Sequence, residues 1–143
     1  MSKINLTITG CMGRMGQQLI KSSYGHKDFK LVSLTENFVV NKKIKEIKPG
    51  FNGVKSFKNS NVIIDFTLPK STLEVLDIAS KLGKKVVIGT TGFNSKEEKL
   101  IEKFSKKIPI LKAGNMSLGI NLLMYLTEIT SKSLGNKFLS KVF

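Results

Sequence analysis

The sequence is poor in the residues that build disulfides and most metal centres. Its 143 residues include one cysteine, Cys11, one histidine and no tryptophan. A single cysteine excludes an intramolecular disulfide framework and a cysteine-rich zinc site, and one histidine excludes a multi-histidine site within this chain. No histidine lies in the segment around Cys11, which disfavours a catalytic thiol. We therefore expect no metal site and a structural role for Cys11.

Long apolar runs are also missing. No run approaches the ~20 residues that a membrane-spanning helix needs. The first residues lack the long apolar core and the small-residue cleavage site of a secretory signal. Hydrophobic residues make up 41% of the chain, which is typical of a folded domain and argues against disorder. We expect a soluble, cytoplasmic protein without a membrane partner.

Arginine is nearly absent, although positive charge is abundant. The chain has 24 Lys and Arg against 10 Asp and Glu, a net charge of +14, and Arg14 is its only arginine. The lysines are spread along the sequence, and the aromatic residues lie mostly in apolar runs. Base readout favours arginine, and single-strand binding needs aromatics among basic residues. Nucleic-acid binding stays open as the weaker interpretation, and we expect no nucleic-acid partner.

Short runs rich in β-branched residues alternate with helical patterns along the chain. Strands are expected at residues 4–9, 29–34, 62–66, 85–88 and 109–111, with a short one near 54–57 and strand character at 138–143. Helices are expected at residues 14–23, after Pro69 to a stop at Gly83, from 94–95 onward, and at 118–134, ended by Gly135. This alternation predicts an α/β fold with a Rossmann-like, doubly wound parallel sheet.

Two of these helix starts carry the spacing of a capping box. Ser71 and Glu74 are three residues apart after Pro69, and Ser95 and Glu98 repeat that spacing. In a capping box the first side chain accepts from the third helical amide, and the acid accepts from the cap amide. We therefore expect Ser71 and Ser95 to cap their helices.

A glycine-rich loop joins the first strand to the first helix. Gly10, Gly13 and Gly16 have the G-x-x-G-x-x-G spacing, a variant of the dinucleotide-binding G-x-G-x-x-G pattern. Small residues let the backbone approach a pyrophosphate, and the helix N-terminus supplies free amides and positive potential. Arg14 adds a cation beside the phosphates. The loop predicts cofactor binding; the alternative is a glycine turn with a structural role only.

Two further loops follow strands of the predicted sheet. Glu36 lies past the second strand, where a carboxylate can accept hydrogen bonds from the adenosine ribose; the alternative is a solvated loop acid. Asn37 follows it instead of a cation, which slightly favours NADH over NADPH. Residues 89–93 read Gly-Thr-Thr-Gly-Phe and offer hydroxyls and amides to the nicotinamide end. Asp65 closes its strand, and we expect it to have a structural hydrogen-bonding role.

Four segments together resemble the 4-hydroxy-tetrahydrodipicolinate reductase (dihydrodipicolinate reductase) family of bacterial lysine biosynthesis. They are the glycine loop with Gln17, the Asp65-Phe66-Thr67 run before Pro69, residues 89–93, and residues 115–121, which read Asn-Met-Ser-Leu-Gly-Ile-Asn. The resemblance extends from Ile4 to about Gly135. It implies a dinucleotide-binding domain at residues 1–117, and at 118–143 the first helix and start of a truncated substrate and oligomerisation domain.

The resemblance also implies NADPH or NADH as cofactor and a set of contacts to it. The pyrophosphate and the ribose would be held by Gly10, Cys11, Met12, Gly13, Arg14, Met15 and Glu36. The residues along the nicotinamide would be Gly89, Thr90, Thr91, Ala113, Gly114, Asn115 and Met116. The family usually has Phe at the position of Met116 and often Pro or Ala at that of Gly114, positions that lie beside the nicotinamide. It usually has a basic residue at the position of Asn37, so the cofactor preference is left open.

The family's second domain carries a His-His-x-x-x-Lys-x-Asp-x-Pro-Ser-Gly-Thr signature, which this sequence lacks. The resemblance therefore implies that the catalytic His and Lys lie beyond the chain end. In the family a hydride passes from NAD(P)H to a cyclic dicarboxylate, on the diaminopimelate route to lysine, and an intact member would form a homotetramer. We expect this chain to bind cofactor without turnover. The alternative is a non-catalytic NAD(P)-binding or redox-sensing module.

Overall fold

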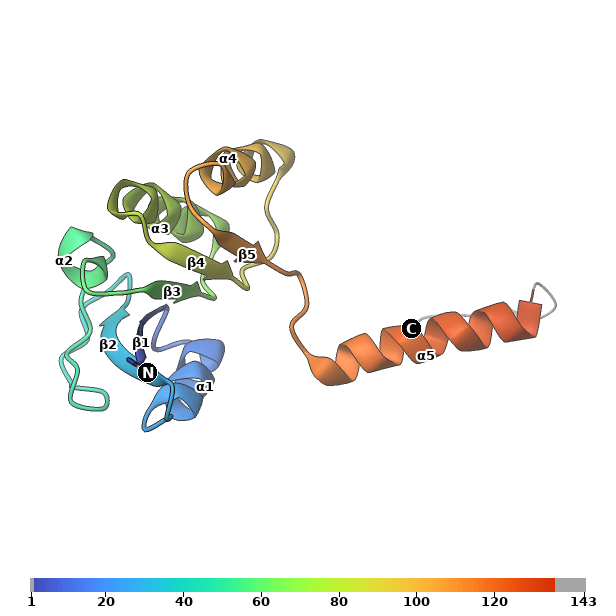
Figure 1. Cartoon of the computed structure of the whole chain (residues 1–143), viewed down its shortest axis with the longest axis horizontal. Helices are drawn as coiled ribbons and strands as arrows, with labels where there is room; N and C mark the ends of the chain where they lie inside the picture. Colours follow the sequence, from blue (N-terminus) through green and yellow to red (C-terminus); the bar gives the residue numbers. More distant parts are fainter. Residues whose placement is uncertain (1, 136–143) are drawn as a thin grey trace. The chain divides into compact units, whose positions relative to one another are not determined.

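The computed structural model describes residues 2–135 and has five strands and five helices in that range. Strands and helices alternate along the chain (Figure 1), and the helix α2 is only a single turn. In chain order the elements are β1 (Ile4–Thr9), α1 (Arg14–Ser23), β2 (Phe29–Thr35), α2 (Val54–Phe57), β3 (Val62–Asp65), α3 (Pro69–Leu82), β4 (Lys85–Ile88), α4 (Ser95–Ser105), β5 (Ile110–Lys112) and α5 (Leu118–Leu134).

The five strands form one parallel sheet in the order β2-β1-β3-β4-β5. This confirms the predicted doubly wound α/β fold. The strand order reverses between β1 and β3, and in such sheets ligands bind outside the carboxyl ends of the strands at that reversal. α1 covers the β1 and β2 side of one face, whereas α3 and α4 cover the opposite face (Figure 1).

Each face of the sheet has its own apolar core, as expected for a parallel sheet covered by helices. The smaller core joins Ile8 and Leu34 of the sheet to Ile20 of α1 and to Cys11. The larger core lies under α3 and α4; its buried members are Phe57, Ile63, Val75, Leu76, Ala79, Val86, Ile88, Ile101 and Ile108. The two cores fix α1 and α3 against the sheet, and with them the loops that enter these helices.

The chain divides into two compact units after Lys112. The second unit contains α5, which carries exposed apolar side chains such as Leu118, Leu123 and Tyr125. Within residues 2–135 no helix has both the length and the apolar character needed to cross a membrane. The functional boundary between residues 117 and 118 stays a prediction, and the strand character at 138–143 lies outside the described residues.

The predicted strand near residues 54–57 is wrong, because this segment forms the single helical turn α2. The amides of Phe57 and Lys58 donate to the carbonyl oxygens of Gly53 and Val54, at 3.1 and 2.9 Å. Phe57 is fully buried in the larger core, while Val54 is exposed. Packing of the Phe57 ring thus overrides the strand propensity of a Val and Phe pair.

The predicted capping box at Ser71 and Glu74 is also wrong. α3 begins one turn earlier, with Leu68 as N-cap and Pro69 in the first turn, and no side chain caps it. Proline suits this position because its missing amide would be unpaired there anyway. Ser71 and Glu74 lie inside the helix, where both instead accept hydrogen bonds from the Asn52 side chain.

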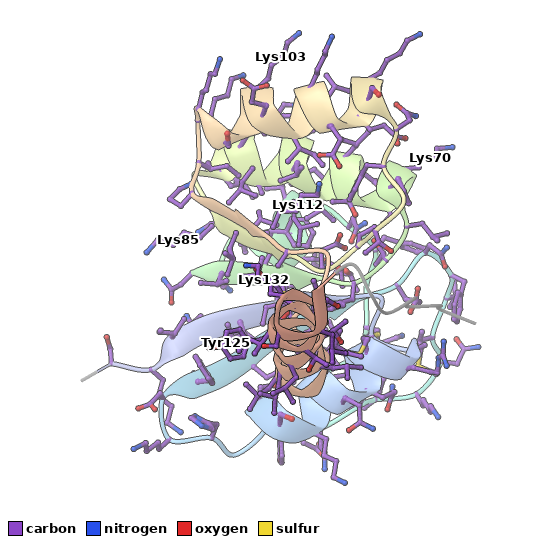
Figure 2. All side chains as sticks on the ribbon, turned by 90° about the vertical axis from the view of Figure 1, so that its right-hand side faces the viewer. Lys70, Lys85, Lys103, Lys112, Tyr125 and Lys132 are labelled. Carbon is purple, nitrogen blue, oxygen red and sulfur yellow. The ribbon has the colours of Figure 1, made fainter. Side chains whose placement is uncertain are left out.

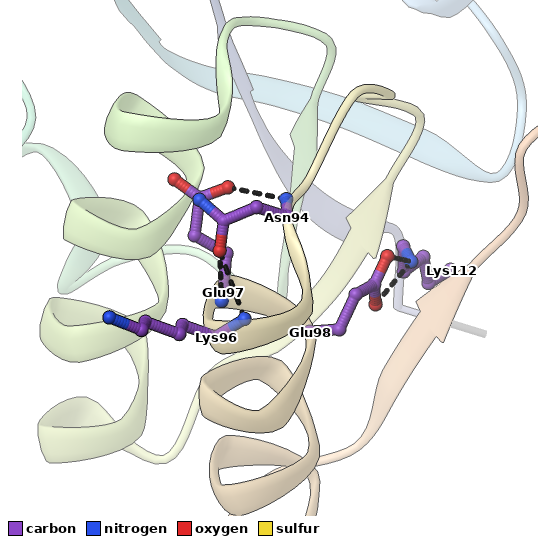
Figure 3. A network of polar contacts seen from close by, with 5 residues as sticks. All are labelled: Asn94, Lys96, Glu97, Glu98 and Lys112. Carbon is purple, nitrogen blue, oxygen red and sulfur yellow. Dashed lines mark hydrogen bonds and ion pairs between the residues drawn. The ribbon is translucent and has the colours of Figure 1, made fainter.

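α4 does have a capping box, but one residue before the predicted pair (Figure 3). The Asn94 side chain accepts from the Lys96 and Glu97 amides at 2.9 and 3.0 Å, and Glu97 accepts from the Asn94 amide at 2.8 Å. Asn94 is therefore the cap in place of Ser95. Glu98 is free to bind the Lys112 ammonium at 2.5 and 2.6 Å, which ties α4 to β5 (Figure 3).

The lysine side chains extend from many different elements. Lys70 on α3, Lys85 on β4 and Lys103 on α4 all point away from the ribbon and are exposed (Figure 2). Within the first unit the positive charge is thus spread over several elements, as the sequence predicts.

Candidate functional site

The loop between β1 and α1 takes its shape from its glycines. Gly10 has a φ of +62°, a conformation that residues with a side chain rarely adopt. A Cβ on Gly16 would lie 2.2 Å from the Gly10 carbonyl oxygen, because the first turn of α1 packs directly on the loop. The Gly13 amide closes the turn by donating to that same oxygen at 3.0 Å. The glycine spacing therefore builds a tight strand-to-helix turn.

The N-terminus of α1 has the properties of an anion site. Gly13 is its N-cap, no side chain caps it, and its first turn contains no acidic residue. Its amides and the positive end of the helix dipole therefore favour a negatively charged ligand. Arg14 and Met15 are exposed on this first turn. The Arg14 guanidinium adds a full positive charge, which suits a phosphate group.

Glu36 comes directly after β2 and is held against the glycine loop. Its Oε2 accepts from the Met12 amide and its Oε1 from the Asn37 amide, both at 3.0 Å. Just before it, the Thr35 carbonyl accepts from the Cys11 amide at 3.1 Å. Two successive hydrogen bonds thus join the end of β2 to the loop. They place the carboxylate beside the predicted pyrophosphate site.

A cleft of about 420 Å³ opens between these loops, at the strand-order reversal. Its volume is within the usual range for small-molecule and cofactor sites. Four of the predicted cofactor-binding residues line it, namely Gly10, Met12, Gly13 and Glu36. The other lining residues come from the segment after Glu36, the turn before α2 and the start of α3: Asn37, Phe38, Asn52, Phe66, Thr67, Leu68 and Ser71.

Cys11 is a residue of the glycine loop, and its side chain is buried in the smaller core. Burial raises the pKa of its thiol from 9.0 to about 11, and the nearby Glu36 carboxylate acts in the same direction. The thiol therefore stays protonated at neutral pH, and a thiol without thiolate character is a poor nucleophile. This agrees with the predicted structural role of Cys11. Cys11 is not among the residues that line the cleft, and its contact to the cofactor stays a prediction.

The loop after β4 is tightly packed at Gly89 and Thr90. A Cβ on Gly89 would lie 2.0 Å from the Phe66 ring, so glycine is needed for that ring to occupy its place. Thr90 is only 3% exposed. Its hydroxyl donates to Asp65 Oδ2 at 3.0 Å and accepts from the Thr67 amide at 2.9 Å. The Thr90 hydroxyl is thus committed to the protein.

Contacts along the nicotinamide stay predictions. Gly89, Thr90 and Thr91 are not among the residues that line the cleft. Ala113, Gly114, Asn115 and Met116 belong to the second compact unit. Within that unit, Asn115 Oδ1 accepts from the Ser117 amide at 2.9 Å, and the Asn115 amide group donates to Asn121 at 3.0 Å. These bonds order the segment that leads into α5.

Asn52 lines the cleft, although the sequence predicts no ligand role for it. It accepts from the Thr35 hydroxyl at 2.7 Å and donates to Ser71 Oγ at 3.3 Å, so it links β2 to α3. Its own segment reads only as an Asn-Gly turn. For Phe66 and Thr67 the sequence does contain a signal, because they lie at the carboxyl end of a predicted strand, where ligands of such sheets bind.

The family of the chain follows from comparison with known sequences. Residues 4–116 match the model of the family described as "Dihydrodipicolinate reductase, N-terminus". The chain belongs to this dihydrodipicolinate reductase family. The matched range contains the glycine loop, Glu36 and every residue that lines the cleft. The N-terminal domain is the dinucleotide-binding domain of the family.

Individual members of the family agree with this assignment. The chain is 70% identical, over its whole length, to the 4-hydroxy-tetrahydrodipicolinate reductase of Pelagibacter ubique, and covers 55% of that protein. It is 39% identical to the 4-hydroxy-tetrahydrodipicolinate reductase of Buchnera aphidicola subsp. Schizaphis graminum, with 92% of this chain and 52% of that protein covered. The chain thus spans about half the length of these reductases.

A solved reductase shares the fold. The dipicolinate-bound dihydrodipicolinate reductase from Paenisporosarcina sp. TG-14 superposes with a TM-score of 0.73 at 22% identity, covering 90% of this chain and 53% of that one.

The residues of the chain also fit a dinucleotide. Gly10 and Gly16 leave no room for a Cβ, the N-terminus of α1 is uncapped, and a carboxylate lies one loop away.

Proposed function

We propose that this chain binds NADH or NADPH in the cleft and is the cofactor-binding part of a 4-hydroxy-tetrahydrodipicolinate reductase. One observation carries the proposal: at the strand-order reversal, the Glu36 carboxylate accepts a hydrogen bond from the Met12 amide in the glycine loop, and no side chain caps the helix that follows this loop. A pyrophosphate suits the amides and the positive end of α1, and the hydroxyls of a neighbouring ribose can donate to the carboxylate. Membership of the reductase family supports the same cofactor class.

Each group of cleft residues has its own part in binding. The backbone from Gly10 to Met15 would hold the pyrophosphate, with Arg14 as the only guanidinium. Glu36 would accept hydrogen bonds from the adenosine ribose through lone pairs that the Met12 and Asn37 amides leave free. Residues 89–91 and 113–116 would lie along the nicotinamide. When bound, the reduced nicotinamide supplies the hydride.

The proposed preference between the two cofactors is for NADH. A carboxylate at the ribose repels the 2′-phosphate of NADPH unless a cation compensates. Asn37 directly follows Glu36, so the position next to the acid carries no positive charge. The lysines of the segment that follows, Lys42 and Lys43, are exposed and could lower the discrimination by approaching the phosphate.

Reduction of the cyclic dicarboxylate is proposed for the longer protein. The curated relatives are about twice as long as this chain, and the family signature with the proton-handling His and Lys is absent from its sequence. We therefore propose that this chain supplies the hydride donor and that the second half supplies the dicarboxylate site. On its own, the chain would bind cofactor without turnover.

A chimeric protein tests this division. The part of the Pelagibacter ubique reductase that has no counterpart here is fused after residue 143, and NADH oxidation is followed with the cyclic dicarboxylate. We expect oxidation by the chimera and none by the chain alone. Rapid turnover by the chain alone would contradict the division of roles. A folded chimera that binds NADH but never responds to the dicarboxylate would favour a non-catalytic or redox-sensing module instead.

A further inference from the structure

Asp65 is a fully buried carboxylate at the carboxyl end of β3. None of the ion pairs among residues 2–135 includes it. Burying a carboxylate is costly unless hydrogen bonds replace its water shell. Here threonine hydroxyls replace that shell, and no buried side-chain polar atom in the described part of the chain lacks a partner.

The four hydroxyls come from four different parts of the fold. Asp65 Oδ1 accepts from Thr9, at the end of β1, at 2.5 Å and from Thr67, in the loop after β3, at 2.8 Å. Its Oδ2 accepts from Thr72 of α3 at 2.5 Å and from Thr90, after β4, at 3.0 Å. One carboxylate therefore joins three strand ends and a helix at the edge where the cleft opens.

Two of these threonines belong to the walls of the candidate site. Thr67 lines the cleft, and its methyl group would lie 2.8 Å from a Cβ on Gly10, so its position limits the space at the glycine loop. The Thr90 hydroxyl accepts from the Thr67 amide while it donates to Asp65. Because a hydroxyl has one proton, the Asp65 carboxylate sets the direction of this chain of hydrogen bonds.

The other two threonines have a second acceptor within reach. Thr9 can donate to the Ile64 carbonyl at 3.4 Å, and Thr72 can donate to the Leu68 carbonyl at 3.2 Å. Thr67 and Thr90 have no such alternative among the described residues. Loss of an acceptor oxygen on Asp65 would therefore leave the cleft-side hydroxyls of Thr67 and Thr90 without a partner, whereas Thr9 and Thr72 could donate to backbone carbonyls instead.

We propose that Asp65 is a positioning residue for the dinucleotide: through Thr67 and Thr90 it holds the loops after β3 and β4 in the shape that admits the cofactor. The inference rests on the proposed function of the cleft. An asparagine at this position keeps the size of the side chain but has one acceptor oxygen and one donor group. Whichever way the amide faces, either Thr67 or Thr90 loses its acceptor.

The test compares Asp65→Asn with Thr72→Val in the full chain. NADH affinity is measured by titration at a temperature where circular dichroism shows both variants folded, and thermal stability is measured in parallel. Loss of a hydrogen bond to a charged group predicts a drop in NADH affinity of about tenfold for Asp65→Asn. Thr72→Val removes a donor to the same carboxylate outside the cleft, so it should lower the melting temperature while affinity changes less than about twofold.

Two results would overturn the inference while the proposed function stands: Asp65→Asn binding NADH as tightly as the wild type, or Thr72→Val losing as much affinity as Asp65→Asn. A wild-type chain that binds no dinucleotide would overturn the proposed function, and the inference with it. If Asp65→Asn does not fold, Thr67→Val cuts the link at its cleft end and keeps the carboxylate. It should then weaken NADH binding severalfold, and unchanged affinity would overturn the inference.

Discussion

The Glu36 carboxylate accepts a hydrogen bond from the backbone amide of Met12 at 3.0 Å. Two features that are 24 residues apart in sequence, an acid after β2 and a glycine loop after β1, are therefore one structural unit. The bond orients the carboxylate toward the cleft that both residues line. A ligand that spans the two must carry groups for an anion site and for a carboxylate acceptor, as the phosphates and ribose of a dinucleotide do.

Glu36→Gln should weaken NADH binding by about tenfold, since hydrogen bonds to a charged group contribute ~1.5–3 kcal/mol. NADPH affinity should fall less or rise, because the charge that repels its 2′-phosphate is gone. The measurement is the ratio of the dissociation constants of the two cofactors for each variant. Glu102→Gln removes an equal charge on α4 and is the matched control. An unchanged ratio would contradict the role of Glu36 at the ribose.

Gly89→Ala should destabilise the chain by about 1–3 kcal/mol, the usual cost of overpacking. The new methyl group would meet the Phe66 ring at 2.0 Å and turn it out of its place. Urea unfolding measures the change. Because the clash is with one side chain, Phe66→Leu in the same chain should restore part of the loss. Gly53→Ala, where no atom lies within 4 Å of the new Cβ, should change stability little.

Cys11 should react with thiol reagents far more slowly in the folded chain than in the unfolded one. Its pKa is raised from 9.0 to about 11, so at pH 8 the folded state has about a hundredfold less thiolate, and the side chain is buried as well. The folded state keeps the proton, so the stabilisation from this group is complete below pH 9 and is lost as pH rises toward 11. Rapid labelling of the folded chain at pH 8 would contradict the assignment.

Asn94→Ala should lower the free energy of unfolding by about 1 kcal/mol, as expected when a helix loses its N-cap side chain. Ser95→Ala is the matched control, because Ser95 is the first helical residue and does not cap α4. Urea unfolding of the two variants distinguishes Asn94 as the N-cap, as in the structure, from Ser95 as the N-cap, as the sequence predicts. A larger loss for Ser95→Ala than for Asn94→Ala would show that α4 begins one residue later.

The sequence predicts the strands and long helices well because their patterns are local. β1, α1 and β4 begin and end as expected, and Gly83 ends α3 with a φ of +64°. Helix starts are harder to predict, because Asn94 and Ser95 both fit a cap with an acid three residues later. At α2 the burial of Phe57 favours a helical turn over a strand, and this burial depends on contacts with distant residues of the larger core.

The candidate site divides in the same way. The glycine loop and Glu36 are recognisable because turn geometry and distance from the strand define them locally. Asn52 is not, because its contacts to Thr35 and Ser71 span 17 and 19 residues of sequence. The sequence pattern also offers the Thr90 hydroxyl as a ligand contact, whereas in the structure it donates to Asp65. Partner choice for such a side chain is decided only when the strands assemble.

The central claim, that the glycine loop holds the pyrophosphate of a dinucleotide, is tested most directly by equilibrium titration of the chain with NADH. Gly13→Asp places a carboxylate at the N-cap of α1 and should weaken binding by at least about tenfold through charge repulsion. Gly53→Asp adds the same charge at an open position that does not line the cleft, and should bind NADH like the wild type. Equal affinity of Gly13→Asp and the wild type would contradict the account.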